Sequence, residues 1–420
     1  MSKIRDKLLS IKLSKDGESI IIHLLGIRIK LKIFNKKTLL FFDLLLPKKK
    51  NKIIFASFPD YSDNSKEFFE YMKEYHSNEY ELVWLLLDSK KNNPKQKLFS
   101  FHHPLGLYHL ITSKYIVYTG LYLANYLNFK RHVLLEVWHG MPLKTLGLNE
   151  KKIPQNTLKQ YIKLAKNGYF FVSSDIFKLS MISSFMMPQD KIFITGQPKT
   201  DCILNNRNRE NIAEFLNVKK FDKIFLYTPT YKEATRNNRR DIEKEFNNIF
   251  YFDDYSSKKL CNFLEEKNAL LIIKPHPFDE KFYKEYLKKG NLINANIKFI
   301  FNADIKKNNF YFYEFFQHTD LMITDFSSIA IDYLIANKPV LFLDNLSKEY
   351  ENNRGFIIED NYNILMPGEK IKSFTELLIK INDAITVDSW KEKRTLSLPL
   401  LHKYQDDKSC ERIYNIMKEL

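Results

Sequence analysis

The sequence is poor in the residues that build disulfide-rich or metal-binding folds. Only 3 of its 420 residues are cysteine, and Cys202, Cys261 and Cys410 are far apart and without CxxC spacing. These features argue against a disulfide framework and against a zinc knuckle, and they favour a reducing compartment. There is also no HExxH motif and no Cys/His cluster. The sequence therefore predicts no metal site.

Long hydrophobic runs are absent as well. The most apolar stretch, residues 38–46 (TLLFFDLLL), contains Asp43 and is about half the length of a membrane span. The first nineteen residues, MSKIRDKLLSIKLSKDGES, lack the continuous apolar segment of a secretory signal. We therefore expect a soluble or peripheral protein of the cytoplasm.

Two common phosphate-binding motifs are missing. No GxxxxGK[ST] loop occurs, which disfavours an ATPase. No Asp-x-Asp occurs either, so the metal–diphosphate bridge of many sugar-nucleotide transferases is absent. If a diphosphate is the leaving group, helix amides, His, Lys and Arg must balance its charge. No cofactor is predicted, and assistance by Mg²⁺ stays open.

What the sequence does contain is typical of a globular protein, with 44% hydrophobic and 15% aromatic residues. Its length suits two domains of about 200 residues each. The net charge is +16, and residues 1–52 hold fourteen Lys or Arg against four acidic residues. A basic nucleic-acid-binding protein is one alternative. Because the surplus lies in one short arm and no recognition motif occurs, we expect no nucleic-acid partner.

The basic arm has a pattern of its own. Residues 19–31 alternate apolar and basic side chains after Gly26, which predicts a small hairpin with a cationic face. Residues 39–52 then place bulky apolar side chains beside a lysine cluster. Such a segment suits an anionic membrane surface, where each lysine contributes about 1 kcal/mol. An ordinary solvated arm is the alternative.

From Lys52 onward, strand-like apolar runs alternate with helical stretches such as 65–75 and 104–112. The runs cover residues 53–58, 81–88, 115–120, 132–140, 169–174 and 191–198, and then 223–230, 269–277, 297–301, 321–325 and 340–344. This alternation predicts an α/β fold with parallel sheets covered on both faces. We expect two Rossmann-like domains facing a central cleft.

The predicted organisation has four parts. They are a basic arm (1–50), an acceptor domain (51–210), a nucleotide-donor domain (211–389) and a final helical segment (390–420) that packs back on the first domain. The polar run at residues 205–217 is the candidate linker.

Polar clusters follow several of the predicted strands, where open α/β sheets bind their ligands. His139 lies in EVWHGMPLKTLG, in a turn with Gly140 and near Lys144. His276 lies between two prolines in KPHP, two residues after Lys274. Histidine in such a turn can act as a base or hold a phosphate oxygen, although a structural role is the alternative.

Residues 321–343 predict a strand, a tight polar turn, a helix and a second strand. Thr324 and Asp325 end the first strand, and Ser327 and Ser328 are typical N-cap residues. Helix N–H groups and two hydroxyls at this position favour a phosphate or pyrophosphate, with an ordinary capped helix as the alternative. Further along, the Arg354 guanidinium could bind a pyrophosphate with two hydrogen bonds, or form a surface ion pair.

Five of these clusters, taken in order, resemble the CDP-glycerol:poly(glycerophosphate) glycerophosphotransferase family. Residues 138–147 (WHGMPLKTLG) are similar to its WHGTPLKKLG, and residues 195–201 (TGQPKTD) to GYPRND. Residues 227–233 (YTPTYKE) resemble APTWRD, and KPHP at 274–277 contains its HP element. Residues 323–356, from ITDFSS to RGF, are similar to the ITDYSS…RGF segment. The resemblance covers about residues 50–400.

The resemblance implies a GT-B fold and a membrane-peripheral enzyme that moves a polyol phosphate from CDP-glycerol or CDP-ribitol to a lipid-linked or glycan acceptor, releasing CMP. His139 would be the general base, with Gly140 and Lys144 beside it. The donor would be held by a set of polar residues, with Asp332 reaching its ribose: Lys274, His276, Thr324, Asp325, Ser327, Ser328, Arg354, Thr230 and Asp332. We count His139 and His276 as the catalytic candidates.

The chain departs from the family motifs at Met141, Gln197 and Lys199, so the choice of polyol stays open. A GT-B glycosyltransferase using a nucleotide sugar is the alternative function.

Overall fold

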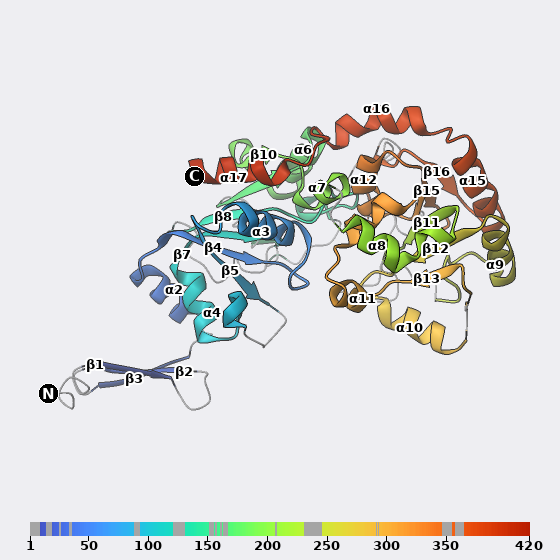
Figure 1. Ribbon diagram of the computed structural model, residues 1–420. Coiled ribbons are helices and arrows are strands. Elements are labelled where there is room, and N and C mark those ends of the chain that lie inside the picture. The colour runs from blue at the N-terminus through green and yellow to red at the C-terminus, as the bar shows by residue number, and fades with distance from the viewer. Residues whose placement is uncertain are drawn as a thin grey trace.

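The structure, a computed structural model, forms three β-sheets (Figure 1). It describes residues 9–13, 19–24, 27–32, 36–87, 93–120, 131–150, 155, 158–159, 162, 167–205, 208–230, 246–290, 292, 294–346, 355–357 and 365–420. Two of the sheets are the centres of separate α/β domains. The third is a small sheet at the N-terminus.

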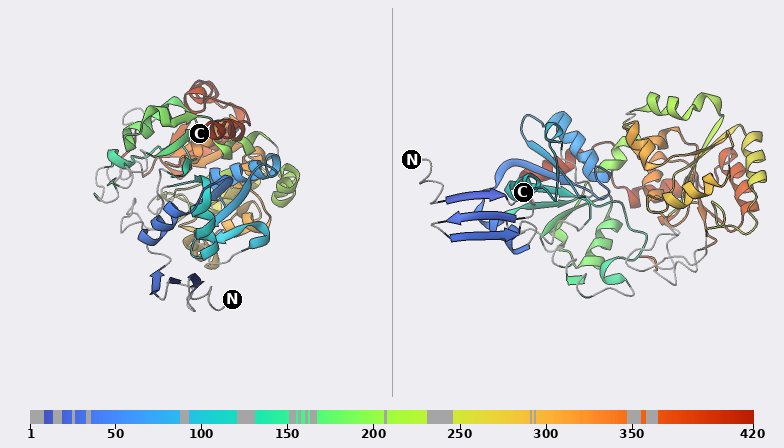
Figure 2. Two further views of the ribbon diagram at one scale, coloured as in Figure 1. Left: turned by 90° about the vertical axis from the view of Figure 1, so that its left-hand side faces the viewer. Right: turned by 90° about the horizontal axis from the view of Figure 1, so that it is seen from below.

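The N-terminal sheet is antiparallel, in the order β1-β2-β3. Strands β2 (Ser19–Leu24) and β3 (Ile27–Lys32) form the expected hairpin. Strand β1 (Leu9–Leu13) adds a third strand that the sequence pattern did not predict. In Figures 1 and 2 this sheet lies beside the first domain and is not part of its core.

The first domain is a parallel sheet of seven strands in the order β10-β9-β8-β7-β4-β5-β6. The order reverses at β4, because β5 and β6 extend to one side of it and β7 to β10 to the other. The strands are β4 (Lys49–Ala56), β5 (Glu81–Leu86), β6 (Leu98–Ser100), β7 (Ser113–Tyr118), β8 (Val133–Glu136), β9 (Gly168–Val172) and β10 (Ile192–Ile194). The helices among them are α3 (Asp63–Tyr75), α4 (Pro104–Thr112), α6 (Asp175–Phe185) and α7 (Pro198–Leu204).

The second domain is a parallel sheet of six strands in the order β13-β12-β11-β14-β15-β16. The order reverses between β11 and β14. The strands are β11 (Lys223–Thr228), β12 (Ala269–Ile273), β13 (Ile297–Phe299), β14 (Leu321–Thr324), β15 (Val340–Leu343) and β16 (Glu369–Ile371). Its helical elements include α8 (Arg209–Leu216), α9 (Ser257–Glu266), α10 (Glu280–Lys288), η7 (Phe312–His318), α12 (Ile329–Tyr333), η8 (Leu334–Ala336) and α15 (Phe374–Thr386).

The central strands are buried on both faces, as their continuous apolar runs predict. Every residue of β12, β14 and β15 is buried. Such strands need helices on both sides, and helices flank the two parallel sheets in Figure 1. The expected α/β architecture of two parallel-sheet domains is therefore present.

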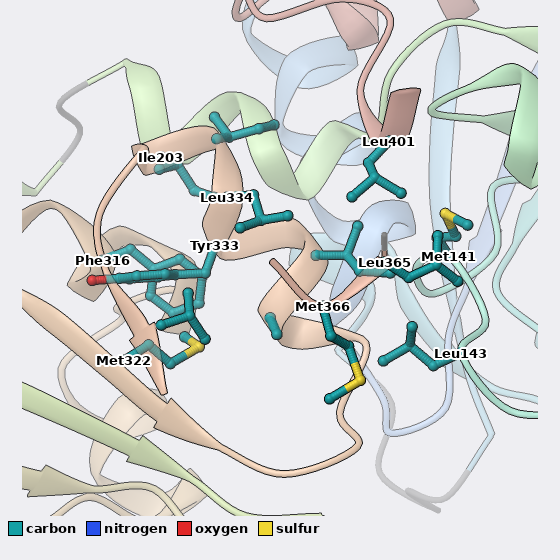
Figure 3. Packing of buried hydrophobic residues seen from close by; sticks show 14 of the residues in the cluster. Met141, Leu143, Ile203, Phe316, Met322, Tyr333, Leu334, Leu365, Met366 and Leu401 are labelled. Atoms are coloured by element: carbon teal, nitrogen blue, oxygen red, sulfur yellow. The ribbon is translucent and has the colours of Figure 1, made fainter. Parts of the chain in front are cut away.

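One hydrophobic cluster crosses the boundary between the domains (Figure 3). Met141 and Leu143 follow β8 of the first domain, and they share this cluster with Leu365 and Met366 of the second. Leu401 of α16 (Lys391–Leu401) belongs to it too. The two domains thus share apolar core, and this core fixes the loops between them.

The C-terminal helix returns to the first domain. Helix α17 (Ser409–Glu419) buries Cys410, Ile413, Tyr414 and Met417 in the same cluster as Phe55 of β4. Figure 1 shows the chain running from α15 through α16 to α17, back across the domain boundary.

The candidate linker at residues 205–217 contains a helix that the sequence pattern did not predict. Helix α8 lies there and buries Ile212 and Leu216 in the cluster that joins the domains. The two apolar residues are four positions apart, on one face of the helix. The surrounding Asn and Arg residues concealed this short pattern.

Residues 36–45 form helix α2, and its side chains are only partly buried. Leu39 is covered, whereas Phe41, Leu44 and Leu45 are 50%, 55% and 62% exposed. None of the helices in the described ranges has the length and apolar character of a membrane span.

Candidate active site

The turn after β8 holds His139 at the surface while its neighbour is buried. Trp138 adopts a positive φ of 51° and is 4% exposed. Its ring stacks on that of His139, with centroids 4.6 Å apart and planes 22° apart. Since His139 is exposed, the buried indole supports the imidazole from one side. This arrangement suits a base that must reach a substrate hydroxyl.

Asn64 ties this turn to the turn that precedes α7. The buried amide of Asn64, in α3, donates to the carbonyls of Val137 (2.9 Å) and Trp138 (3.0 Å) and to Gln197 Oε1 (2.7 Å). Its oxygen accepts from the backbone N–H of Lys199 at 3.0 Å. No sequence pattern indicates this role, because every partner is distant along the chain.

In the second domain, Ser327 and Ser328 lie between β14 and α12. Ser328 is the N-cap residue of α12, but its side chain makes no capping hydrogen bond. Its backbone carbonyl accepts from Ile331 N–H at 3.1 Å, and that of Ser327 from Ala330 N–H at 3.1 Å. Both side chains are partly exposed, and within the described residues neither hydroxyl makes a hydrogen bond. Their predicted role in binding a phosphate stays a prediction.

The two turns meet at Gly140. Its φ is +119°, which L side chains rarely adopt. A Cβ atom at this position would lie 2.9 Å from Lys199 Nζ and 3.6 Å from both Asp332 Oδ2 and Ser328 Oγ. The backbone of the histidine turn therefore packs directly against α12. His139 and Ser328 come from different domains, and the structure brings their loops together.

A second contact across the boundary involves the segment around Lys144. Lys144 forms an antiparallel bridge with Phe356. Thr145 N–H donates to the Gly355 carbonyl at 3.2 Å, and Ile357 N–H to the Leu143 carbonyl at 2.9 Å. Arg354 itself lies outside the described residues, so its predicted contact with the pyrophosphate stays a prediction.

Asp332 lies in a buried polar network, and its contact with a ribose stays a prediction. It is 1% exposed, and its Oδ2 lies 2.9 Å from Lys199 Nζ and accepts from Tyr313 Oη at 2.7 Å. Burial opposes the charge on Lys199, but Asp332 and Asp63 outweigh it and raise the lysine pKa. The sequence did not predict this network. The one local indication of it was that Lys199 follows a predicted strand closely.

Thr324 and Asp325 brace the end of the second sheet. Thr324 is fully buried and its hydroxyl donates to the Thr228 carbonyl at 2.6 Å. The Asp325 carboxylate accepts from the backbone N–H of Thr230 at 3.0 Å and from its hydroxyl at 3.0 Å. Thr230, Thr324 and Asp325 therefore hold the loops after β11 and β14 to each other.

Lys274 and His276 follow β12, the strand on the other side of β11. Lys274 is 7% exposed; its ammonium donates to the Pro275 carbonyl at 2.8 Å and lies 3.5 Å from Glu280. Burial lowers its pKa to about 8. His276 is partly exposed, and its Nδ1 accepts from Phe278 N–H at 3.3 Å. Strands β12, β11 and β14 are parallel neighbours. The loops that follow these three strands therefore lie together at the carboxyl ends of the strands.

Glu136, the last residue of β8, is fully buried and accepts a hydrogen bond from the histidine turn. Its Oε1 accepts from the N–H groups of Trp138 and Gly120, both at 2.9 Å. Its Oε2 has no hydrogen-bond partner within the described part of the chain. Burial raises the pKa of this carboxyl to about 8. The sequence pattern did not single out Glu136, because a charged residue at the end of an apolar strand looks like an exposed one.

In the described ranges, no group of three or more His, Cys, Asp or Glu is placed to hold a metal ion. Hydroxyls, imidazoles and lysines converge here together with the carboxylates of Asp325 and Asp332, which are bonded to other side chains. The hydroxyls and imidazoles suit an anionic ligand.

The two parallel-sheet domains, with strand-end loops that meet across their boundary, define a GT-B-like α/β protein. The family model for CDP-Glycerol:Poly(glycerophosphate) glycerophosphotransferase matches residues 38–419. The chain belongs to this family and is a transferase of the polyol-phosphate class. The predicted family and fold class are confirmed.

Individual relatives agree with this assignment. The chain is 27% identical over 353 residues to the teichoic acid poly(glycerol phosphate) polymerase of Bacillus spizizenii, covering 80% of this chain and 84% of that protein. It is 23% identical over 287 residues to the teichoic acid ribitol-phosphate polymerase TarL of Staphylococcus aureus, covering 67% and 46%. A structure of the wall teichoic acid polymerase TagF soaked with CDPG matches with a TM-score of 0.72 at 21% identity, covering 92% and 94%.

The ionisation of Glu136 generates a prediction for Glu136→Gln. The ordinary pKa of a glutamate is 4.5, and burial raises the pKa of Glu136 to about 8. Between these values the unfolded chain binds fewer protons than the folded chain, so the glutamate lowers stability increasingly as the pH rises to 8. Glutamine keeps an oxygen for both N–H donors and removes the ionisation. The melting temperature should rise by roughly 2–4 °C at pH 8 and remain unchanged near pH 4.5.

Scanning fluorimetry between pH 4.5 and 9 measures this effect. Glu266→Gln is the matched control, because the Glu266 side chain is 71% exposed on α9 and should show no such pH dependence. An equal shift of the Glu136 variant at every pH would contradict the assigned pKa.

Proposed function

We propose that this enzyme transfers glycerol phosphate or ribitol phosphate from a CDP-polyol to a hydroxyl of a lipid-linked or glycan acceptor in cell-surface polymer synthesis. The observation that carries the proposal is the contact at Gly140, which sets the His139 turn of one domain against the Ser328 turn of the other. A general base and a pyrophosphate site must face each other in such a reaction. The family membership supports the donor class.

In the proposed reaction, His139 removes the proton from the acceptor hydroxyl. The acceptor oxygen attacks the β-phosphorus of the donor, and the bond between that phosphorus and the bridging oxygen breaks. CMP leaves with the bridging oxygen, and a phosphodiester remains on the acceptor. Phosphoryl transfer depends mainly on alignment and charge neutralisation, which suits a site of preorganised donors.

The donor pyrophosphate would be bound by the loops at one edge of the second sheet. Ser327 and Ser328 supply hydroxyl donors, and His276 and Lys274 supply an imidazole and an ammonium. On the basis of the sequence motif, we expect the Arg354 guanidinium to donate further hydrogen bonds to the pyrophosphate. Thr230, Thr324 and Asp325 position these loops through their mutual hydrogen bonds. No metal is needed for this scheme, and a contribution from Mg²⁺ stays open.

The acceptor side would be formed by the histidine turn. Gly140 lets the backbone approach α12, and the Lys144 segment joins the segment around Phe356. A nucleotide-sugar glycosyltransferase could use the same base, but it would form a glycosidic bond. Analysis of the product for a phosphodiester separates the two functions.

We also propose that α2 and α4 rest on the anionic inner face of the cell membrane. These neighbouring helices expose bulky apolar side chains: Phe41, Leu44 and Leu45 on α2, and Leu105 and Tyr108 on α4. Two exposed lysines, Lys49 and Lys50, lie shortly after α2. Apolar insertion beside lysines suits a surface of acidic lipids, where a lipid-linked acceptor would be presented.

One prediction of the proposed function concerns His139→Ala. Purified enzyme with CDP-glycerol or CDP-ribitol and an acceptor should release CMP, and loss of the base should lower kcat about 10²- to 10⁴-fold. The melting temperature should be unchanged, since His139 is exposed. His102→Ala, at another exposed histidine of the first domain, is the control. Wild-type turnover in the His139 variant would remove this residue from the mechanism.

A second prediction concerns the two serines. The double variant Ser327→Ala with Ser328→Ala should weaken CDP-polyol binding roughly 10²- to 10⁴-fold, because each of the two lost hydrogen bonds to a charged group is worth about 1.5–3 kcal/mol. Isothermal titration calorimetry measures the affinity. Ser257→Ala, on the exposed start of α9, should bind like the wild type. Unchanged affinity in the double variant would exclude this loop from the donor site.

A third prediction concerns the membrane surface. Phe41→Ser combined with Leu44→Ser should reduce binding to phosphatidylglycerol vesicles on the order of tenfold, because two apolar side chains no longer insert. Co-sedimentation measures the bound fraction. Ile379→Ser with Val387→Ser removes two similarly exposed apolar side chains at α15 and the residue that follows it, and is the control. Equal loss in both variants would argue against a specific membrane face.

A further inference from the structure

One buried ammonium contacts the catalytic turn of the first domain and a helix of the second at once. Lys199, in α7, is 1% exposed. Its Nζ donates to the His139 carbonyl at 2.8 Å and lies 2.9 Å from Asp332 Oδ2 in α12. The same side chain therefore holds the peptide of His139 and the helix that begins after Ser328.

The network around Lys199 consists of polar and aromatic partners from both domains. Tyr313 of η7 donates to Asp332 at 2.7 Å, and its ring centre lies 5.0 Å from the Lys199 ammonium. Asp63, at the start of α3, lies 3.8 Å from that ammonium. Figure 1 shows α7 beside α12 at the junction of the domains. Two carboxylates keep the lysine charged in spite of its burial.

Burying a charged group costs desolvation free energy, and apolar packing of similar volume often stabilises a structure equally well. The domains already share the apolar cluster that contains Met141 and Leu365. What an ion pair adds over apolar contacts is direction, since its hydrogen bonds fix distances and angles between the bonded groups. Here the bonded groups are the main chain of His139 and the helix beside Ser328.

We propose that Lys199 is a positioning residue that sets the His139 imidazole against the donor site by bonding both the His139 carbonyl and Asp332. This inference rests on the proposed function, in which His139 is the base and Ser328 contacts the donor. Lys199 acts through these residues and does not itself contact the reacting atoms. Asp332 and Tyr313 serve as its anchor in the second domain.

A neighbouring lysine offers a matched comparison. Lys66 of α3 also reaches the second domain, with its ammonium 5.2 Å from the centre of the Tyr311 ring. Tyr311 and Tyr313 stack on each other, with centroids 5.4 Å apart. Lys66 thus contacts the same aromatic pair as Lys199, but its known contacts are with tyrosine rings and not with the histidine turn. If domain attachment alone matters, the two lysines should behave alike.

The test compares Lys199→Met with Lys66→Met, Lys199→Arg and the double variant Lys199→Met with Asp332→Asn. A misplaced catalytic group typically costs on the order of 10²-fold, so Lys199→Met should lose about that factor in kcat for CMP release. The KM for the CDP-polyol should change less than about threefold, since the donor ligands remain. Lys66→Met should retain wild-type kcat, and Lys199→Arg should lie within about tenfold of it, because it keeps the charge.

The double variant separates positioning from stability. Lys199→Met leaves Asp332 buried without its cation and should lower the melting temperature, whereas the added Asp332→Asn removes that carboxylate charge and should restore it. If Lys199 positions His139, kcat stays low in the double variant although stability has returned. Recovery of kcat together with stability would overturn the proposal.

Hydrogen exchange tests the same idea without activity. Amides of residues 138–145 should exchange faster in Lys199→Met than in Lys66→Met, because the anchor of that turn is lost. Equal exchange in the two variants would overturn the positioning role. If the wild type releases CMP from neither CDP-glycerol nor CDP-ribitol, the proposed function fails, and the exchange result still decides whether Lys199 holds the turn.

Discussion

The structure depends on apolar core that is continuous across the domain boundary. One hydrophobic cluster contains residues that follow β8 and residues of α8, η7 and α16. Each domain would therefore expose part of this apolar core if the other were absent. Figure 3 shows Leu143 and Met141 facing Leu365 and Met366 at this junction. Because interiors pack at nearly crystalline density, such a junction transmits the position of one domain to the loops of the other. This packing fixes the loops that make the polar contacts at Gly140 and Lys199.

In the proposed function, polar side chains bind the pyrophosphate that many nucleotide-dependent transferases bind through a metal ion. The residues at the edge of the second sheet are lysine, histidine and serine, and the described part of the chain shows no cluster of metal ligands. Hydroxyls and imidazoles neutralise charge less than Mg²⁺, so more of them must converge. Three neighbouring strands, β12, β11 and β14, provide that convergence because their carboxyl ends lie at one edge. In the proposed function, the order of the strands therefore determines which side chains surround the pyrophosphate.

Much of the fold could be predicted from the sequence, because buried parallel strands appear as continuous apolar runs. Strands such as β12 and β14 were located within a few residues for this reason. Strands β6 (LFS) and β16 (EKI) were missed, because neither is a continuous apolar run. Helix α8 was not predicted within the candidate linker, because its polar residues concealed the short apolar pattern of Ile212 and Leu216.

The site was predictable where it depends on strand ends and not where it depends on distant partners. His139 and Ser328 each follow a strand, and the general rule for open sheets places such residues near a ligand. The role of Asn64 depends on contacts with Val137, Trp138 and Gln197, all far along the chain. The pairing of Asp332 with Lys199 likewise crosses the domain boundary and has no local signature. Long-range hydrogen bonds are the part of the site that only the three-dimensional structure reveals.

The return of α17 to the first domain has a mechanical consequence. The chain passes between the domains twice, once ahead of α8 and once between α16 and α17. Two covalent connections at one boundary limit twisting of one domain against the other. Compared with a chain that crossed the boundary once, the two domains have fewer ways to separate.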